Sequence, residues 1–109
     1  MLKFIDSVTI AGHKWKVLYP YHFKERTDYN GQADTALLEI RVTDVDECGN
    51  VRPDIVIIKT FLHELVHAID RHYCMWMIGR EVDKENLTEG MATGLTQVMM
   101  ENNPLWVIL

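Results

Sequence analysis

The chain has few of the features that would place a protein outside the cell or in a membrane. Its only cysteines, Cys48 and Cys74, lie far apart and form neither a disulfide framework nor a CxxC metal pair. No apolar run approaches the ~20 residues that span a bilayer. The opening "MLKFIDSVTI" also lacks the apolar core of a signal peptide. These absences predict a cytoplasmic protein with reduced thiols and no membrane partner.

Clustered positive charge is absent as well. The 11 Lys and Arg residues are scattered among 16 Asp and Glu residues, which gives a net charge of -5. Binding to phosphate backbones needs a basic patch or stripe, so nucleic acid is not expected as a partner. What is present, 48% hydrophobic and 25% charged residues in 109 positions, is typical of one globular unit. We therefore predict a single domain over residues 1–109.

The first half of the sequence has the pattern of β-strands. In "SVTIAGHKWKVLYP", apolar residues alternate with polar ones on both sides of a short turn, which predicts a hairpin. "DYNGQ" carries an Asn-Gly turn signal. The strand expected after it places Leu38, Ile40 and Val42 on a buried face, with Arg41 on the other face. These patterns predict a small, twisted and largely antiparallel sheet.

The second half has the pattern of helices. Apolar residues recur at helical spacing between Ile55 and Ile69, which predicts a long, mostly buried helix over residues 53–73 that begins with Pro53. A connector over residues 77–86 is expected to lead into a second main helix that ends near "ENNP". The apolar "PLWVIL" is expected to complete the core rather than to cover a cleft. A sheet followed by two helices is an α+β fold.

The first helix contains "HELVH", a pattern with chemical meaning. Residues four apart lie on one helical face, so His63 and His67 can present two imidazoles to one ion. Zinc accepts imidazole nitrogen and lowers the pKa of bound water to about 7. Glu64 is rotated by about 100° from His63 and can therefore act on that water instead of binding the metal. Polar residues on a buried helix are costly unless partnered, so we predict Zn2+ here rather than a coincidence of composition.

The stretches "HELVHAID" and "TEGMATGLTQVMMENNP" together resemble the small phage- and prophage-encoded metallopeptidase-like proteins, a minimal gluzincin type among the HExxH zincins. The likeness also covers "LLEIRV". The resemblance implies a zincin-like minimal catalytic core in which Glu64 is the general base and His63 and His67 bind the metal. It further implies that the strand around Leu38–Val42 borders the cleft, where an extended peptide could pair by strand addition.

Gluzincins take their third metal ligand from a second helix, and the resemblance places it at Glu89 in "TEGMAT". The spacing from His67 allows the second helix to return antiparallel to the first, and small neighbours would allow a close approach. A competing interpretation is a capping box, in which Glu89 bonds the backbone of Asn86. Further candidate ligands or metal-site partners are Asp70, His72 and Glu85.

Two functions agree with these residues. The first is a zinc-dependent metallopeptidase that hydrolyses a peptide or protein substrate. The alternative is a zinc-stabilised protein-binding module with weak or no catalysis, which the lack of a clear downstream His or Tyr oxyanion donor favours. Glu64 favours the peptidase, because a purely structural zinc site has no use for a base beside an open coordination position. We expect the peptidase.

Overall fold

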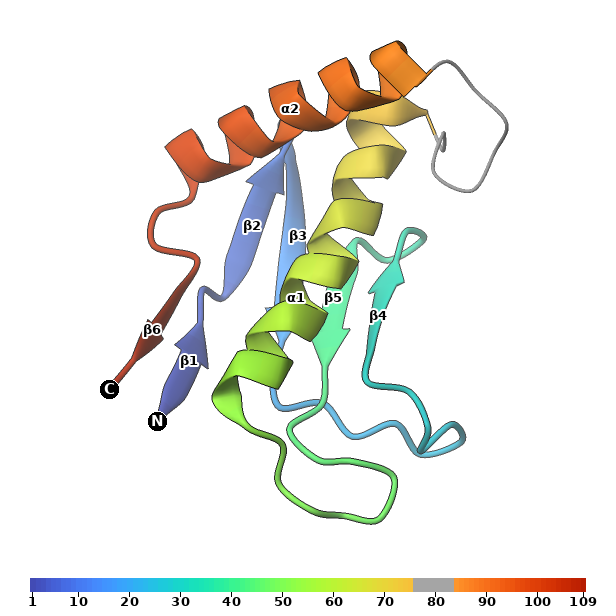
Figure 1. Cartoon of the computed structure of the whole chain (residues 1–109), viewed down its shortest axis with the longest axis vertical. Helices are drawn as coiled ribbons and strands as arrows, with labels where there is room; N and C mark the ends of the chain where they lie inside the picture. Colours follow the sequence, from blue (N-terminus) through green and yellow to red (C-terminus); the bar gives the residue numbers. More distant parts are fainter. Residues whose placement is uncertain (76–83) are drawn as a thin grey trace.

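A computed structural model describes residues 1–75 and 84–109, in which a long helix lies over one face of a small sheet (Figure 1). The elements in chain order are β1 (Leu2–Phe4), β2 (Ser7–Ile10), β3 (His13–Leu18), β4 (Gly31–Asp34), β5 (Glu39–Val42), α1 (Asp54–Ile69), the π-helical segment η1 (Asp70–Cys74), α2 (Lys84–Glu101) and β6 (Trp106–Ile108). The main sheet has the order β2-β3-β5-β4, and β1 pairs separately with β6. The predicted α+β class is confirmed.

The predicted hairpin is formed by β2 and β3, which pair antiparallel with Val8 opposite Trp15. Ala11 and Gly12 connect them with φ angles of 50° and 80°. Two residues with positive φ form the type of tight turn whose twist suits a hairpin. Val8 and Trp15 are fully buried, so the alternation in the sequence correctly identified the inward face.

The predicted turn at Asn30-Gly31 is wrong, because Gly31 opens the strand β4. The chain instead reverses after Asp34, whose carboxylate accepts hydrogen bonds from the amides of Ala36 and Leu37, both at 3.0 Å. An aspartate that bonds the backbone two and three residues ahead stabilises a turn. Leu38 lies in that turn with a φ of 54° and not in the strand where the sequence placed it.

The edge strand of the sheet on this side is β4 and not the predicted segment 38–42. Within the predicted segment, the strand β5 is paired on both sides. It pairs in parallel with β3 and antiparallel with β4. Its backbone has no free edge for a peptide. Ile40 and Val42 are fully buried, as predicted.

Helix α1 packs its apolar face on the sheet, and its buried residues include Phe61, Leu65 and Ile69. Phe61 contacts Phe4, with ring centroids 4.6 Å apart. The predicted helix over residues 53–73 is realised as α1 followed by η1, with Pro53 as the cap in an extended conformation. Ile55, expected in the buried stripe, is 73% exposed because it lies in the first turn, beyond the sheet.

Helix α2 crosses the end of α1 and does not return antiparallel along it (Figure 1). A Cβ at Gly90 would lie 2.9 Å from the carbonyl oxygen of Tyr73, and one at Gly94 would lie 2.4 Å from Ile69 Cγ2. The small residues thus allow α2 to approach closely, as predicted. The approach is to η1 and to the last residue of α1, and not along the length of α1. The predicted connector lies partly outside the described residues, and its last three positions, 84–86, already belong to α2. Asn86 is therefore inside the helix, and the capping-box interpretation is wrong.

The apolar end of the chain lies beside its beginning. Strand β6 pairs antiparallel with β1, with Leu2 opposite Ile108, and Leu105 is buried in the core. The expectation that this segment completes the core is confirmed for Leu105 and for Trp106, which packs against the core, whereas Val107, Ile108 and Leu109 are exposed. Helices in the described part of the chain are too short or too polar to cross a bilayer.

Candidate metal centre

His63, Glu64 and His67 converge on the side of α1 that faces β4. One potential ligand atom from each residue lies within 4.8 Å of the other two. The two imidazole centroids are 5.0 Å apart, with the ring planes at 72°. His63 is exposed and His67 is half-buried, so both rings can be reached from solvent. The helical spacing brings these residues together as the sequence predicts.

Glu64 is only 8% exposed, and this burial raises the pKa of its carboxyl group above the ordinary value. The neighbouring charges of His63 and His67 and a hydrogen bond from the Ala33 backbone act in the opposite direction and lower this pKa. The Ala33 amide is the donor in that bond. The carboxylate is thus held between the histidine pair and the backbone of β4.

Within residues 1–75 and 84–109, no strand pairs with the outer edge of β4 beside this group. Where β4 begins, the amide of Thr43 donates to the carbonyl of Asn30 at 3.0 Å. In an antiparallel pair, bonded and non-bonded positions alternate, so the N–H and C=O groups of Gly31 and Ala33 point away from β5. The Ala33 bond to Glu64 agrees with this direction. The remaining outward groups are available to an extended chain.

Gly31 allows this close contact between strand and helix. A Cβ at this position would lie 2.7 Å from Thr60 Cγ2 and 3.0 Å from Glu64 Cγ. Any other residue would push β4 away from α1. The Asn-Gly pair predicted a turn, but Gly31 instead allows β4 and α1 to pack closely against each other.

Two adjoining hollows, together called the cleft, lie along the histidine face. One has a volume of about 450 Å³ and the other about 410 Å³. Both are lined by Tyr29, Gly31, His63 and Glu64. The first hollow extends to Thr35 and His67, and the second extends to Arg52 and Lys59. No pattern in the sequence predicts that Tyr29 and Arg52 border the histidines, because both lie in loops outside the helix that carries the motif.

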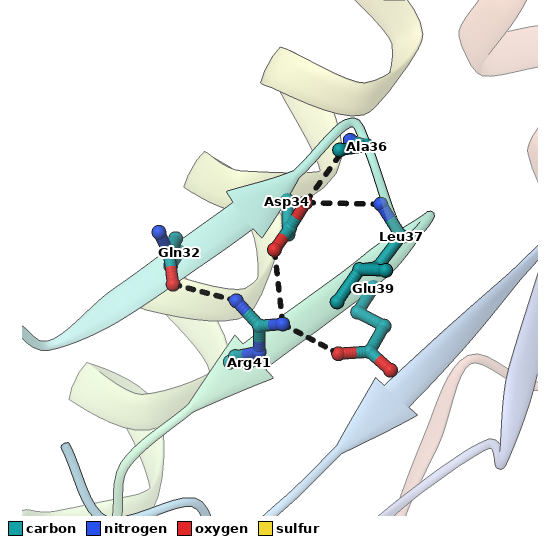
Figure 2. A network of polar contacts seen from close by, with 6 residues as sticks. All are labelled: Gln32, Asp34, Ala36, Leu37, Glu39 and Arg41. Carbon is teal, nitrogen blue, oxygen red and sulfur yellow. Dashed lines mark hydrogen bonds and ion pairs between the residues drawn. The ribbon is translucent and has the colours of Figure 1, made fainter.

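A polar network on the other face of the sheet fixes β4 to β5 (Figure 2). The Arg41 guanidinium donates to Gln32 at 2.8 Å and to Glu39 at 2.6 Å, and it pairs with Asp34 at 3.0 Å. Bonds from the Leu37 amide and from Arg41 keep the pKa of Asp34 below its usual range. Arg41 is 9% exposed, so the face that the sequence assigned to solvent is partly covered.

The other predicted ligands lie apart from this group. Glu89 is exposed on α2, which packs on η1, and its role as third ligand stays a prediction. Asp70 is buried in η1, and Glu85 is exposed at the start of α2. His72 accepts a hydrogen bond at Nε2 from the Trp15 indole at 3.0 Å. Within residues 1–75 and 84–109, the histidine pair has only Glu64 as an acidic neighbour in the group.

No protein-family model, curated protein or solved structure matches this chain. A functional assignment therefore depends on the residues of the site and on the physical chemistry of their arrangement. The two cysteines add nothing to the site, since Cys48 and Cys74 are both free thiols outside the cleft.

Proposed function

We propose that this protein is a zinc-dependent metallopeptidase in which His63 and His67 hold the metal and Glu64 is the general base. The observation that carries the proposal is the convergence of three potential ligand atoms within 4.8 Å in a cleft beside a free strand edge. A site that only held a metal would not need an unpaired strand edge beside it. An edge that only bound a partner chain would not need the two histidines.

The donor set fits zinc. Two imidazole nitrogens one helical turn apart are a common pair of zinc ligands, and in catalytic sites three protein ligands leave one coordination position open. Under this proposal, Glu89 remains the candidate for the third ligand. When bound, zinc supplies a Lewis acid that allows water to lose a proton near neutral pH.

Glu64 is suited to accept that proton and to return it to the leaving amine. Burial raises the pKa of its carboxyl group, and a raised pKa brings a carboxylate closer to the range in which proton transfer is efficient at neutral pH. The Ala33 amide orients the carboxylate at the edge of β4. A substrate in extended conformation would pair with the outward groups of Gly31 and Ala33 and so lie across the histidine face.

Tyr29 is the candidate for stabilising the oxyanion of the reaction. It lines both hollows of the cleft, and its hydroxyl oxygen accepts a hydrogen bond from Arg26 Nη1 at 3.3 Å. A hydroxyl that accepts this bond keeps its own hydrogen as a donor. The sequence leaves the early tyrosines, Tyr73 and His72 all open as candidates for this role, and the lining of the cleft favours Tyr29.

The second candidate function is a zinc-stabilised module that binds a protein partner without catalysis. The position of Glu89 outside the His63–Glu64–His67 group counts against catalysis, because catalytic zinc sites have three protein ligands. For either function we place the protein in the cytoplasm, where its free thiols would stay reduced, and we propose the phage or prophage origin that the resemblance implies.

Metal content and turnover together test the proposal. We expect about one zinc per native chain by elemental analysis, and loss of that zinc in both His63→Ala and His67→Ala. Glu64→Gln should keep zinc and fold but lower peptide hydrolysis by about a hundredfold or more. The exposed Glu47→Gln is the matched control and should hydrolyse at the native rate. Zinc without hydrolysis in the native protein would favour the binding module, and absence of zinc would remove both functions.

A further inference from the structure

Arg52 is a buried cation at one end of the cleft. It is 8% exposed and lines the hollow next to His63. Its guanidinium donates to the carbonyl of Thr43 at 3.3 Å and to the hydroxyl of Thr60 at 2.7 Å. Both acceptors are neutral, and no carboxylate in residues 1–75 and 84–109 forms an ion pair with it. A buried charge without a counter-charge is costly, and arginine cannot become neutral.

A second cation faces the same space. Lys59 lies one turn before His63 on α1, lines the same hollow and is exposed. It too has no ion pair within the described part of the chain. Asp28 also lines the hollow, but both of its carboxylate oxygens are bonded by Arg26, at 3.1 and 3.0 Å. Glu64 also lines the hollow, so with Asp28 neutralised by Arg26 the cations Arg52 and Lys59 exceed the remaining carboxylate by one charge, in a protein whose net charge is -5.

We infer that this end of the cleft is a subsite for a carboxylate of the peptide substrate. The inference rests on the proposed function and specifies it. The volume of about 410 Å³ can hold a side chain, and a carboxylate there would supply the counter-charge that Arg52 lacks. Charge-assisted hydrogen bonds to guanidinium and ammonium are stronger than neutral ones, so the subsite selects acidic groups over amides of equal size. The carboxylate can belong to an acidic side chain or to the end of a peptide.

Peptide binding to zinc-loaded Glu64→Gln protein tests the subsite, because this variant leaves peptides intact. The probes are acetylated, fluorescently labelled hexapeptide amides in which Glu replaces Gln at each position in turn. One further Gln peptide has a free terminal carboxylate, so the set separates the two sources. We expect one or more carboxylate peptides to bind about threefold tighter or more than the Gln amide, with the difference shrinking as salt rises.

Charge variants locate the subsite. Lys59→Gln should remove much of the preference, whereas Lys3→Gln, an equal charge change at an exposed site on β1, should preserve it. Arg52→Gln should remove the remainder, with circular dichroism as a check on folding, because Arg52 also bonds Thr43 and Thr60. Lys59→Gln keeps the test valid if Arg52→Gln does not fold.

Equal binding of Glu and Gln peptides would overturn the subsite while the peptidase proposal stands. A preference that survives Lys59→Gln unchanged would place the carboxylate elsewhere and would also overturn it. If none of the peptides binds, the subsite is refuted, and the zinc and turnover assay decides separately whether the proposed function falls with it.

Discussion

At the scale of the residue, burial shifts the pKa values of Glu64 and His72 in opposite directions for one reason. Burial disfavours the charged form of a side chain, so it raises the pKa of the Glu64 carboxyl and lowers the pKa of the His72 imidazole. The charges of His13 and Arg71 lower the pKa of His72 further. His13 stacks on His72 with ring centroids 4.5 Å apart, a contact between residues far apart in the sequence.

The stability of the fold should therefore depend on pH through His72. Its pKa in the folded state lies below the unfolded value of about 6.5, so the unfolded chain binds more protons as the solution is acidified. The stabilising contribution is present above the unfolded pKa and is lost as the pH falls through it toward the folded pKa. His72→Gln, which retains an acceptor for Trp15, should lose less stability than the native protein between pH 7.5 and pH 5.5.

Urea unfolding at several pH values measures this difference. His13→Gln is an informative second variant, because removing a neighbouring positive charge should flatten the native pH dependence in part. Parallel pH profiles for native and His72→Gln proteins would show that another group controls the acid sensitivity.

At the scale of the element, the sequence predicts what is local and misses what depends on distant contacts. The hairpin of β2 and β3 and the helix α1 carry their own alternation or helical periodicity, and both were correctly predicted. The motif on α1 needs nothing beyond that helix to align His63 and His67. By contrast, β4 has the sequence "GQAD", which shows no alternation of apolar and polar residues. Its strand conformation depends on contacts of Arg41 from β5 and on the approach of α1 to Gly31.

Gly31→Ala should disturb both the fold and the site. The added Cβ would lie 2.7 Å from Thr60 Cγ2 and 3.0 Å from Glu64 Cγ, which is too close without movement of β4 or α1. We expect a loss of about 1–3 kcal/mol in the free energy of unfolding, together with reduced peptide hydrolysis. Urea unfolding and turnover of the same samples provide the two measurements.

Thr60→Ser makes this prediction specific. It deletes the methyl group that the new Cβ would meet but retains the hydroxyl that bonds Arg52. The Gly31→Ala/Thr60→Ser double variant should regain part of the stability that Gly31→Ala loses. Recovery should be incomplete, because Glu64 Cγ and the Arg41 carbonyl are still close. Strictly additive losses in the double variant would refute the steric explanation.

At the scale of the whole molecule, the two edges of the main sheet differ in whether side chains of another element cover their backbone groups. The edge at β2 is covered by amide side chains from α2: Gln97 donates to the Thr9 carbonyl at 2.9 Å and accepts from the Ala11 amide at 2.9 Å. Exposed strand edges invite pairing with other chains, and proteins usually protect them. The edge at β4 keeps outward backbone groups beside the histidines. The sequence could not show this asymmetry, because it arises only where α2 meets β2.

Asn102 completes the cover of β2 and should be a stabilising residue. Its side-chain oxygen accepts from the Thr9 amide at 2.8 Å, and its nitrogen donates to the carbonyls of Thr9 and Val98 at 2.9 and 3.0 Å. It is 5% exposed, and Asn102→Ala would leave the Thr9 amide without its acceptor, whereas the Thr9 carbonyl would keep Gln97 and the Val98 carbonyl would keep the backbone amide of residue 102. We expect a loss of about 1–3 kcal/mol in the free energy of unfolding.

Zinc binding separates the contribution of Asn102 to the fold from any effect on the site. Asn102 lies at the end of α2 and bonds β2, the strand at the opposite edge of the sheet from β4, so the folded variant should bind zinc with native stoichiometry. Met100→Ala, at a 79% exposed position of the same helix, should change stability by no more than about 0.5 kcal/mol. If Asn102→Ala were as stable as Met100→Ala, solvent would be able to replace these bonds, and the edge of β2 would not need the cover of α2.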